Sequence, residues 1–134
     1  MRFLLDTCVV SDFSRGEPGT LDRIKSTPPV DIAVSAVTEM EIVHGLRLNA
    51  GLSRRLKPVI EAFLGSVHVL PYDRSAALAS ARVRAALRRR GQPIGAYDVL
   101  IAGTALAEDL VLVTSNLNEF GRIEALRLDN WRRQ

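Results

Sequence analysis

The segment FLLDTCVVSDF, residues 3–13, decides the fold because it joins a short apolar run to a carboxylate and then to small polar residues. FLLD, residues 3–6, is predicted to be a short buried strand that Asp6 ends. A carboxylate at this position has two interpretations. It caps the turn or helix that follows, or it is one ligand of a metal site whose other ligands lie far along the chain.

Further strands and helices alternate along the chain. Short apolar strands are predicted at residues 31–35, 67–71, 110–114 and 125–128. Helices are predicted near residues 9–16, 19–26, 35–48, 53–64, 73–91 and 96–109. This alternation predicts an α/β fold with a short, mostly parallel central sheet of about five strands, flanked by helices.

Three of these helices differ in their apolar pattern. The helix at 35–48 is expected to present one apolar face, formed by Val37, Met40, Val43 and Leu46. The helix at 73–91 is expected to turn arginines outward and to bury Ala76, Ala79, Val83, Ala86 and Leu87. The helix at 96–109 is apolar almost all round and should be buried.

Composition bounds the class of protein. With 134 residues, 47% hydrophobic and 25% charged, the chain is expected to form a single domain over residues 1–134. No apolar run is long enough for a membrane span or a signal peptide, so we expect a cytoplasmic protein without a membrane partner. Cys8 is the single cysteine, which excludes an internal disulfide and a multi-cysteine zinc site. It is interpreted as a small buried residue rather than a catalytic thiol.

The basic residues are almost all arginines. Of 18 Lys and Arg residues only Lys25 and Lys57 are lysines, and the net charge is +3. Arginine binds phosphate in a bidentate fork, although genomic base composition explains this ratio equally well. Candidates for binding phosphate groups are Arg82, Arg84, Arg88 and Arg89 on the helix at 73–91. A solvated helix face is the alternative explanation for that run.

Three carboxylates stand out by context. Asp6 ends a strand, Glu41 lies in the helix after the second strand, and Asp98 begins the apolar helix. Each has a structural alternative: a cap for Asp6, a capping box with Thr38 for Glu41, and a helix-dipole position for Asp98, worth ~0.3–1 kcal/mol. Ligands of parallel sheets gather at the carboxyl ends of the strands, where Thr114 also lies. Carboxylates sharing that edge raise one another's pKa values or require a counter-cation, for which their oxygens favour Mg²⁺ or Mn²⁺.

Other α/β hydrolase patterns are absent from the sequence. A phosphatase with a D-x-D motif after the first strand is disfavoured because position 8 is cysteine. The chain contains no phosphate-binding G-x-x-x-x-G-K-[ST] loop, no G-x-G-x-x-G and no G-x-S-x-G nucleophile elbow.

Four segments in order resemble PIN-domain ribonucleases, in particular the VapC-type toxins of bacterial toxin–antitoxin pairs. They are FLLDTCVVSD, VSAVTEMEIVHGL, PIGAYDVLIAGTAL and LVLVTSNLNEFGRIEALRLDNW, and together they cover nearly the whole chain. The resemblance implies a three-layer fold. It also implies catalytic roles for Asp6, Glu41, Asp98 and Asn116, a metal bound by the first three, and supporting roles for Thr7, Thr114 and Glu119. Two positions depart from the family: Cys8 replaces a frequent asparagine, and Asn116 replaces an acid.

The resemblance also implies an activity and a partner. The activity is hydrolysis of RNA by water that Mg²⁺ or Mn²⁺ activates. The partner is a VapB-like antitoxin that blocks the acidic pocket, with the toxin as a homodimer within a larger hetero-oligomer. The alternative is a catalytically weak RNA-binding or scaffold protein with the same fold.

Overall fold

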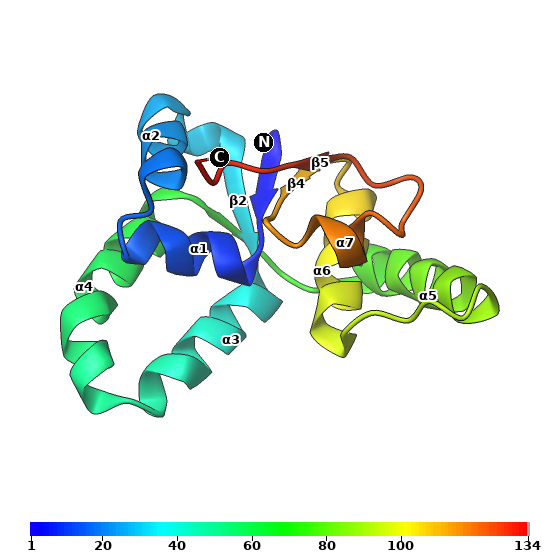
Figure 1. Ribbon diagram of the computed structural model, residues 1–134, viewed down its shortest axis with the longest axis horizontal. Coiled ribbons are helices and arrows are strands. Elements are labelled where there is room, and N and C mark those ends of the chain that lie inside the picture. Colours follow the sequence, from blue (N-terminus) through cyan, green and yellow to red (C-terminus); the bar gives the residue numbers. More distant parts are fainter. Residues whose placement is uncertain (134) are drawn as a thin grey trace.

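The computed structural model describes residues 1–133, and its centre is a five-stranded sheet (Figure 1). The strands are β1 (Phe3–Leu5), β2 (Ile32–Ser35), β3 (His68–Leu70), β4 (Val111–Val113) and β5 (Leu128–Asp129). They lie in the order β3-β2-β1-β4-β5, and every neighbouring pair is parallel. The predicted α/β class, with a parallel sheet of about five strands, is therefore confirmed.

Helices cover both faces of this sheet. They are α1 (Thr7–Ser14), α2 (Pro18–Ser26), α3 (Ala36–Arg47), α4 (Ala50–Ser66), α5 (Arg74–Arg89), α6 (Ala96–Ala107) and α7 (Leu117–Phe120), with a 3₁₀ turn at Pro29–Asp31. In Figure 1, α1, α2 and α4 lie to one side of the strands and α5, α6 and α7 to the other. The expected three-layer arrangement is present. None of the helices in residues 1–133 combines the length and the apolar character that crossing a membrane requires.

The alternation of side chains along β1 explains the two cores. Leu4 points to one face and packs with Leu112 against α5 and α6. Phe3 and Leu5 point to the other face and pack with Val113 against α1 and α4. Because both faces of the sheet are covered, β1 and β4 are apolar throughout.

The predicted burial of α6 is confirmed, and a glycine makes it possible. A Cβ atom placed on Gly103 would lie 1.9 Å from the Ser80 hydroxyl and 2.8 Å from the Ala76 carbonyl oxygen. Only a residue without a side chain therefore lets α6 approach α5 this closely. This contact fixes the position of α6, whose first turn carries Asp98.

The predicted apolar face of α3 is partly wrong. Met40 is 43% exposed and Val43 is 40% exposed, whereas the buried residues of α3 are Val37, Thr38 and Ile42. A stripe of residues three apart drifts around a helix of 3.6 residues per turn, so it does not stay on one side. The buried stripe instead follows Thr38 and Ile42, four residues apart, and includes a polar residue that hydropathy alone excludes.

Two smaller predictions also differ from the structure, and one short helix was not predicted. Ala86 is exposed, because α6 covers the neighbouring stripe of α5 instead. The last strand is β5 at Leu128–Asp129 rather than 125–128. Residues 117–120 form α7, a single turn too short to produce a periodic pattern.

Candidate active site

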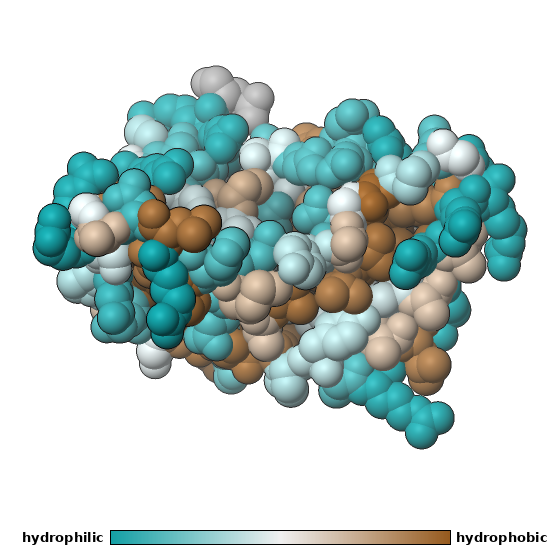
Figure 2. Space-filling view, turned by 90° about the horizontal axis from the view of Figure 1, so that it is seen from below, coloured by the Kyte–Doolittle hydropathy of each residue, from teal (hydrophilic) through white to brown (hydrophobic). Residues whose placement is uncertain are grey.

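The carboxyl ends of β1, β2 and β4 lie side by side because these strands are parallel neighbours. Asp6 follows β1, Ser35 ends β2 and Thr114 follows β4. α3 begins directly after β2 and carries Glu41, and α6 carries Asp98 in its first turn. Figure 2 looks at the molecule from the side toward which β1 points in Figure 1. Polar residues do gather at this edge of the sheet, as the sequence predicted.

Asp6 is 5% exposed, and both of its carboxylate oxygens have protein partners. Oδ1 accepts a hydrogen bond from the backbone N–H of Val9 at 3.0 Å, which caps α1, and one from the Cys8 thiol at 3.0 Å. Oδ2 accepts a hydrogen bond from the Thr114 hydroxyl. Burial is the main cause that raises the pKa of Asp6. Because an ionised carboxylate offers about four lone-pair sites, Asp6 can cap the helix and still accept a further ligand.

Glu41 is held by the first residue of α1. The Thr7 hydroxyl donates a hydrogen bond to Glu41 Oε1 at 2.7 Å and lies 3.3 Å from the Thr38 hydroxyl. The N-cap of α3 is Ser35, whose hydroxyl accepts from the Val37 N–H at 3.0 Å. The capping box between Thr38 and Glu41 is therefore not formed, and the Glu41 carboxylate is directed toward α1 instead.

Asp98 meets three other carboxyl groups. The pKa of Asp98 is raised to about 6, mainly by burial and further by a hydrogen bond shared with Glu119 and by the charges of Glu119, Asp6 and Glu41, all of which are included in that value. Asp98 also occupies the first turn of α6, as predicted from its sequence position. The structure thus places Asp6, Glu41, Asp98 and Glu119 close enough to repel one another.

Asn116, which was expected to complete the site, forms hydrogen bonds with Glu119. Its Nδ2 donates a hydrogen bond to Glu119 Oε2 at 2.8 Å, and its Oδ1 accepts from the Glu119 backbone N–H at 3.4 Å. The backbone N–H of Asn116 in turn donates to the Thr114 hydroxyl at 2.9 Å. The geometry therefore makes Glu119 the fourth carboxylate, and Asn116 the residue that orients it.

Cys8 belongs to the same network. Its thiol lies 3.3 Å from the Ser115 hydroxyl in addition to its contact with Asp6. Burial and the charge of Asp6 raise the pKa of Cys8, so the thiol stays protonated at neutral pH. A protonated thiol is a poor nucleophile, which agrees with the prediction that Cys8 is not a catalytic thiol.

Thr38 was expected only as the partner of Glu41 in a capping box. It lies three residues before Glu41 and so shares a helix face with it, which is a signal that the spacing contained. Ser115 follows β4 between Thr114 and Asn116, at the edge where polar residues were expected to meet, and the structure adds its contact with Cys8 across that edge.

The four carboxylates have no cationic partner within residues 1–133. None of them forms an ion pair with an arginine, lysine or histidine there. Within the same residues, no three histidine, cysteine, aspartate or glutamate side chains are close enough to hold a metal ion without moving. The residues nevertheless fit Mg²⁺, which keeps several of its waters and needs only one or two direct carboxylate ligands.

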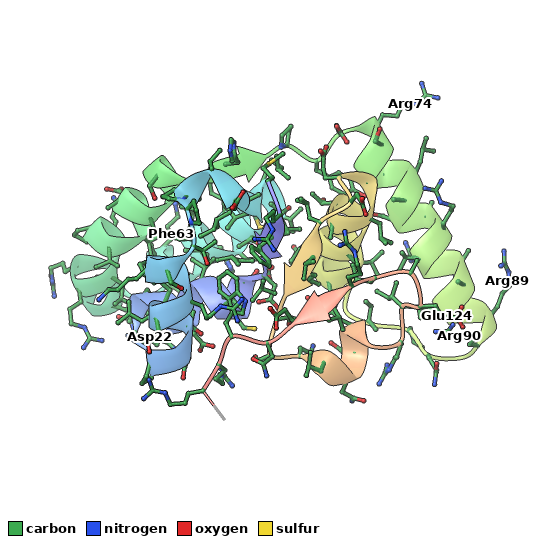
Figure 3. All side chains as sticks on the ribbon, turned by 90° about the horizontal axis from the view of Figure 1, so that it is seen from above. Asp22, Phe63, Arg74, Arg89, Arg90 and Glu124 are labelled. Carbon is green, nitrogen blue, oxygen red and sulfur yellow. The ribbon has the colours of Figure 1, made fainter. Side chains whose placement is uncertain are left out.

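The predicted phosphate-binding arginines are exposed on α5. Arg82, Arg84, Arg88 and Arg89 all face solvent. Figure 3 shows Arg89 pointing away from the molecule, while Arg90 lies beside Glu124, with which it forms an ion pair at 3.6 Å. A groove of about 300 Å³ between α5, the end of α6 and residues 122–125 is lined by Arg82, Arg90 and Arg122.

A model of the PIN domain matches residues 3–126 of the chain. The chain belongs to the PIN-domain family.

Within that family the chain is similar to VapC proteins over almost its whole length. It is 35% identical over 131 residues to the tRNA(fMet)-specific endonuclease VapC of Salmonella typhimurium. It is 32% identical over 131 residues to ribonuclease VapC2 of Haemophilus influenzae. Both comparisons cover 98% of each chain. The structure resembles DNA-bound VapBC from Salmonella typhimurium, with a TM-score of 0.90, 36% identity and 98% of both chains covered. It also resembles VapBC2 from Rickettsia felis bound to a promoter DNA fragment, with a TM-score of 0.89, 25% identity and 98% and 99% covered. The resemblance to VapC-type proteins noted from the four segments is confirmed.

Proposed function

We propose that this chain is a metal-dependent endoribonuclease that acts as the toxin of a toxin–antitoxin pair. The observation that carries the proposal is the group of Asp6, Glu41, Asp98 and Glu119, which meet at the sheet edge and form no ion pair with a cationic side chain of residues 1–133. A buried group of like charges is costly unless a cation or a proton neutralises it. The named ribonuclease relatives support the choice of reaction.

The metal we propose is Mg²⁺ or Mn²⁺, because the available donors are carboxylate oxygens. Asp6 and Asp98 would be direct ligands, and Glu41 would bind directly or through water. A metal bound there supplies polarisation of the phosphodiester and a lowered pKa for a bound water.

The protein's own contribution is to orient these carboxylates and the attacking water. Thr114 fixes Asp6, Thr7 fixes Glu41, and Asn116 fixes Glu119 through the hydrogen bonds described above. Glu41 is our candidate for accepting a hydrogen bond from the attacking water and aligning it with the phosphate. Hydrogen bonds of this kind around metal ligands are typically worth 10- to 100-fold in affinity or activity.

We propose transfer RNA as the first substrate to test, because two relatives at 35% and 34% identity are named for tRNA(fMet). Arg82, Arg84, Arg88 and Arg89 are proposed to hold RNA phosphates beyond the acidic site. The proposed protein partner is a VapB-like antitoxin, since the similar solved structures are VapBC complexes. We further propose that the toxin is a cytoplasmic homodimer that its antitoxin binds in a larger assembly.

The proposal is tested by incubating the purified protein with total RNA and with initiator transfer RNA. Reactions contain Mg²⁺, Mn²⁺ or EDTA, and compare the wild type with Asp98→Asn and with the control Glu61→Gln. Glu61 lies on α4, and its side chain is 65% exposed. Glu61→Gln therefore also removes one carboxylate charge, but outside the site. We expect cleavage by the wild type and the control with metal, and none in EDTA or by Asp98→Asn.

Binding of Mn²⁺ by calorimetry gives a reading independent of catalysis. The wild type should bind the metal, and Asp98→Asn should bind it at least tenfold more weakly. Metal binding without RNA cleavage would favour the scaffold alternative. Cleavage that persists in EDTA, or in Asp98→Asn, would show that the proposed mechanism is wrong.

A further inference from the structure

Tyr97 differs from every other aromatic residue in residues 1–133 because its side chain is exposed. It is 50% exposed, and it is the residue immediately before Asp98. Phe3, Phe63, Phe120 and Trp131 are buried, with exposures of 8%, 5%, 1% and 3%. Tyr72 and Phe13 are partly buried, the first packed on the core and the second 4.9 Å from the Phe63 ring. The other six rings of residues 1–133 are therefore packed within the fold, whereas the Tyr97 ring is accessible to a ligand.

Tyr97 and Asp98 are consecutive residues in the first turn of α6. Because successive Cα atoms are about 3.8 Å apart, the exposed ring is attached to the helix end that carries the Asp98 carboxylate. Within residues 1–133 the Tyr97 side chain makes no hydrogen bond and no ring contact. It has no structural task that would explain an aromatic residue there.

Two other residues of the site are also followed or preceded in the sequence by an exposed apolar residue. Met40 precedes Glu41 and is 43% exposed, and Leu117 follows Asn116 and is 44% exposed. Figure 2, which faces this end of the sheet, shows apolar side chains exposed among polar ones. Asp98, Glu41 and Asn116 therefore each have an exposed apolar or aromatic side chain next to them in the sequence.

This arrangement selects which part of an RNA can be bound beside the centre. The carboxylates repel phosphate groups, whereas a neutral ring attracts the flat face of any base. Unpaired bases of RNA loops stack on exposed tyrosine rings in this manner. We infer that the Tyr97 ring stacks on an unpaired base next to the phosphate that is cut. The inference rests on the proposed function, whose substrate is RNA.

The first test is kinetic. Tyr97→Ala, Tyr97→Leu and Tyr97→Phe are compared with the wild type on the transfer RNA transcript that the wild type cuts. When stacking persists from bound substrate to transition state, its loss raises KM and leaves kcat unchanged. We expect KM to rise about 5- to 150-fold in Tyr97→Ala, somewhat less in Tyr97→Leu, and to stay within about twofold in Tyr97→Phe.

The control is Leu48→Ala, which removes another exposed apolar side chain, 75% exposed, at the far end of α3. It should change neither KM nor kcat. Because Tyr97 is exposed, Tyr97→Ala should also keep the melting temperature of the wild type, which separates loss of stacking from loss of folding.

The second test does not require cleavage. Binding of the same transcript is measured in EDTA, using versions in which single loop bases are replaced by abasic positions. One abasic position should weaken binding to the wild type as much as Tyr97→Ala does, and should have no further effect on Tyr97→Ala. This result would support the inference even if the protein cut no RNA, in which case only the proposed catalysis would fail.

Three outcomes would overturn the inference. Unchanged KM and RNA binding in Tyr97→Ala would do so while leaving the nuclease proposal intact. Loss of binding in Tyr97→Phe would do so because it would assign the effect to the hydroxyl. Weaker copurification of an antitoxin with Tyr97→Ala, without any change in RNA binding, would show that the ring contacts a protein partner.

Discussion

Replacing Asp98 by asparagine should stabilise the protein when no metal is bound. Burial, the hydrogen bond to Glu119 and the charges of Glu119, Asp6 and Glu41 all oppose ionisation of Asp98. Asparagine has almost the same shape and carries no charge, so the variant removes this repulsion and leaves the packing of α6 unchanged. The free energy of unfolding in EDTA at pH 7 should therefore be higher for Asp98→Asn than for the wild type.

The size of the effect follows from the pKa. It rises from 3.8 to about 6, roughly two units, and each unit corresponds to about 1.4 kcal/mol. Because Asp98 is only half-buried and shares its proton with Glu119, we expect about 1–2 kcal/mol rather than the full amount. The folded state binds the proton of the Asp98 carboxyl more tightly than the unfolded state does. Protonation of Asp98 therefore stabilises the folded state fully below pH 3.8, and this stabilisation is lost as the pH rises through about 6.

Urea unfolding of both proteins in EDTA, at several pH values between 4 and 7, measures this difference. The wild type should lose stability relative to Asp98→Asn as the pH rises, and most of the loss should occur before pH 7. Glu61→Gln, the exposed control, should run parallel to the wild type. Adding Mn²⁺ at pH 7 should restore the stability of the wild type and have a smaller effect on Asp98→Asn.

Two results would contradict this reasoning. Parallel stability curves between pH 4 and 7 would show that the carboxylates do not oppose one another. A loss of stability in Asp98→Asn, measured in EDTA at pH 7, would show that the charge of Asp98 stabilises the first turn of α6 and that the helix-dipole effect outweighs the repulsion.

Two other substitutions test how the site is held in place. Thr7→Val removes the hydroxyl that donates to Glu41, so it should lower kcat about 10- to 100-fold and reduce the free energy of unfolding by about 1 kcal/mol. Thr7→Ser keeps the hydroxyl and should keep the wild-type kcat and stability. RNA cleavage rates and urea unfolding measure the two effects, and an unchanged kcat in Thr7→Val would show that Glu41 does not need this hydrogen bond. Gly103→Ala forces a methyl group against Ser80 and should destabilise the protein by about 1–3 kcal/mol. Gly65→Ala, on α4 with nothing within 4 Å of the added carbon, should instead be neutral or stabilise by up to about 1 kcal/mol, and equal effects of the two alanines would contradict the close packing of α5 and α6.

The sheet and the burial of α6 could be predicted from the sequence because each depends on a local pattern. Short apolar runs separated by helical segments require parallel strands, and the end of each strand then places its polar residue at one edge. The face of α3 could not be predicted in the same way, because its burial depends on Thr38, a polar residue that contacts Thr7. Which residues a helix buries is decided by its neighbours in space, and hydropathy describes only the helix itself.

The same distinction explains the two residues whose roles the structure changes. Asp6 could be a cap or a ligand when only its neighbours in sequence were considered, and the cap is present: its Oδ1 accepts from the Val9 N–H. Oδ2 is held by Thr114, which lies 108 residues further along the chain, and this contact ties Asp6 to the far side of the site. Glu119 was expected only as a supporting residue, because in the family the acid before Phe120 completes the site only in some members, and Asn116 stood at the position expected to complete it. In the structure the Asn116 amide holds the Glu119 carboxylate, so the negative charge missing at position 116 is supplied one helical turn later.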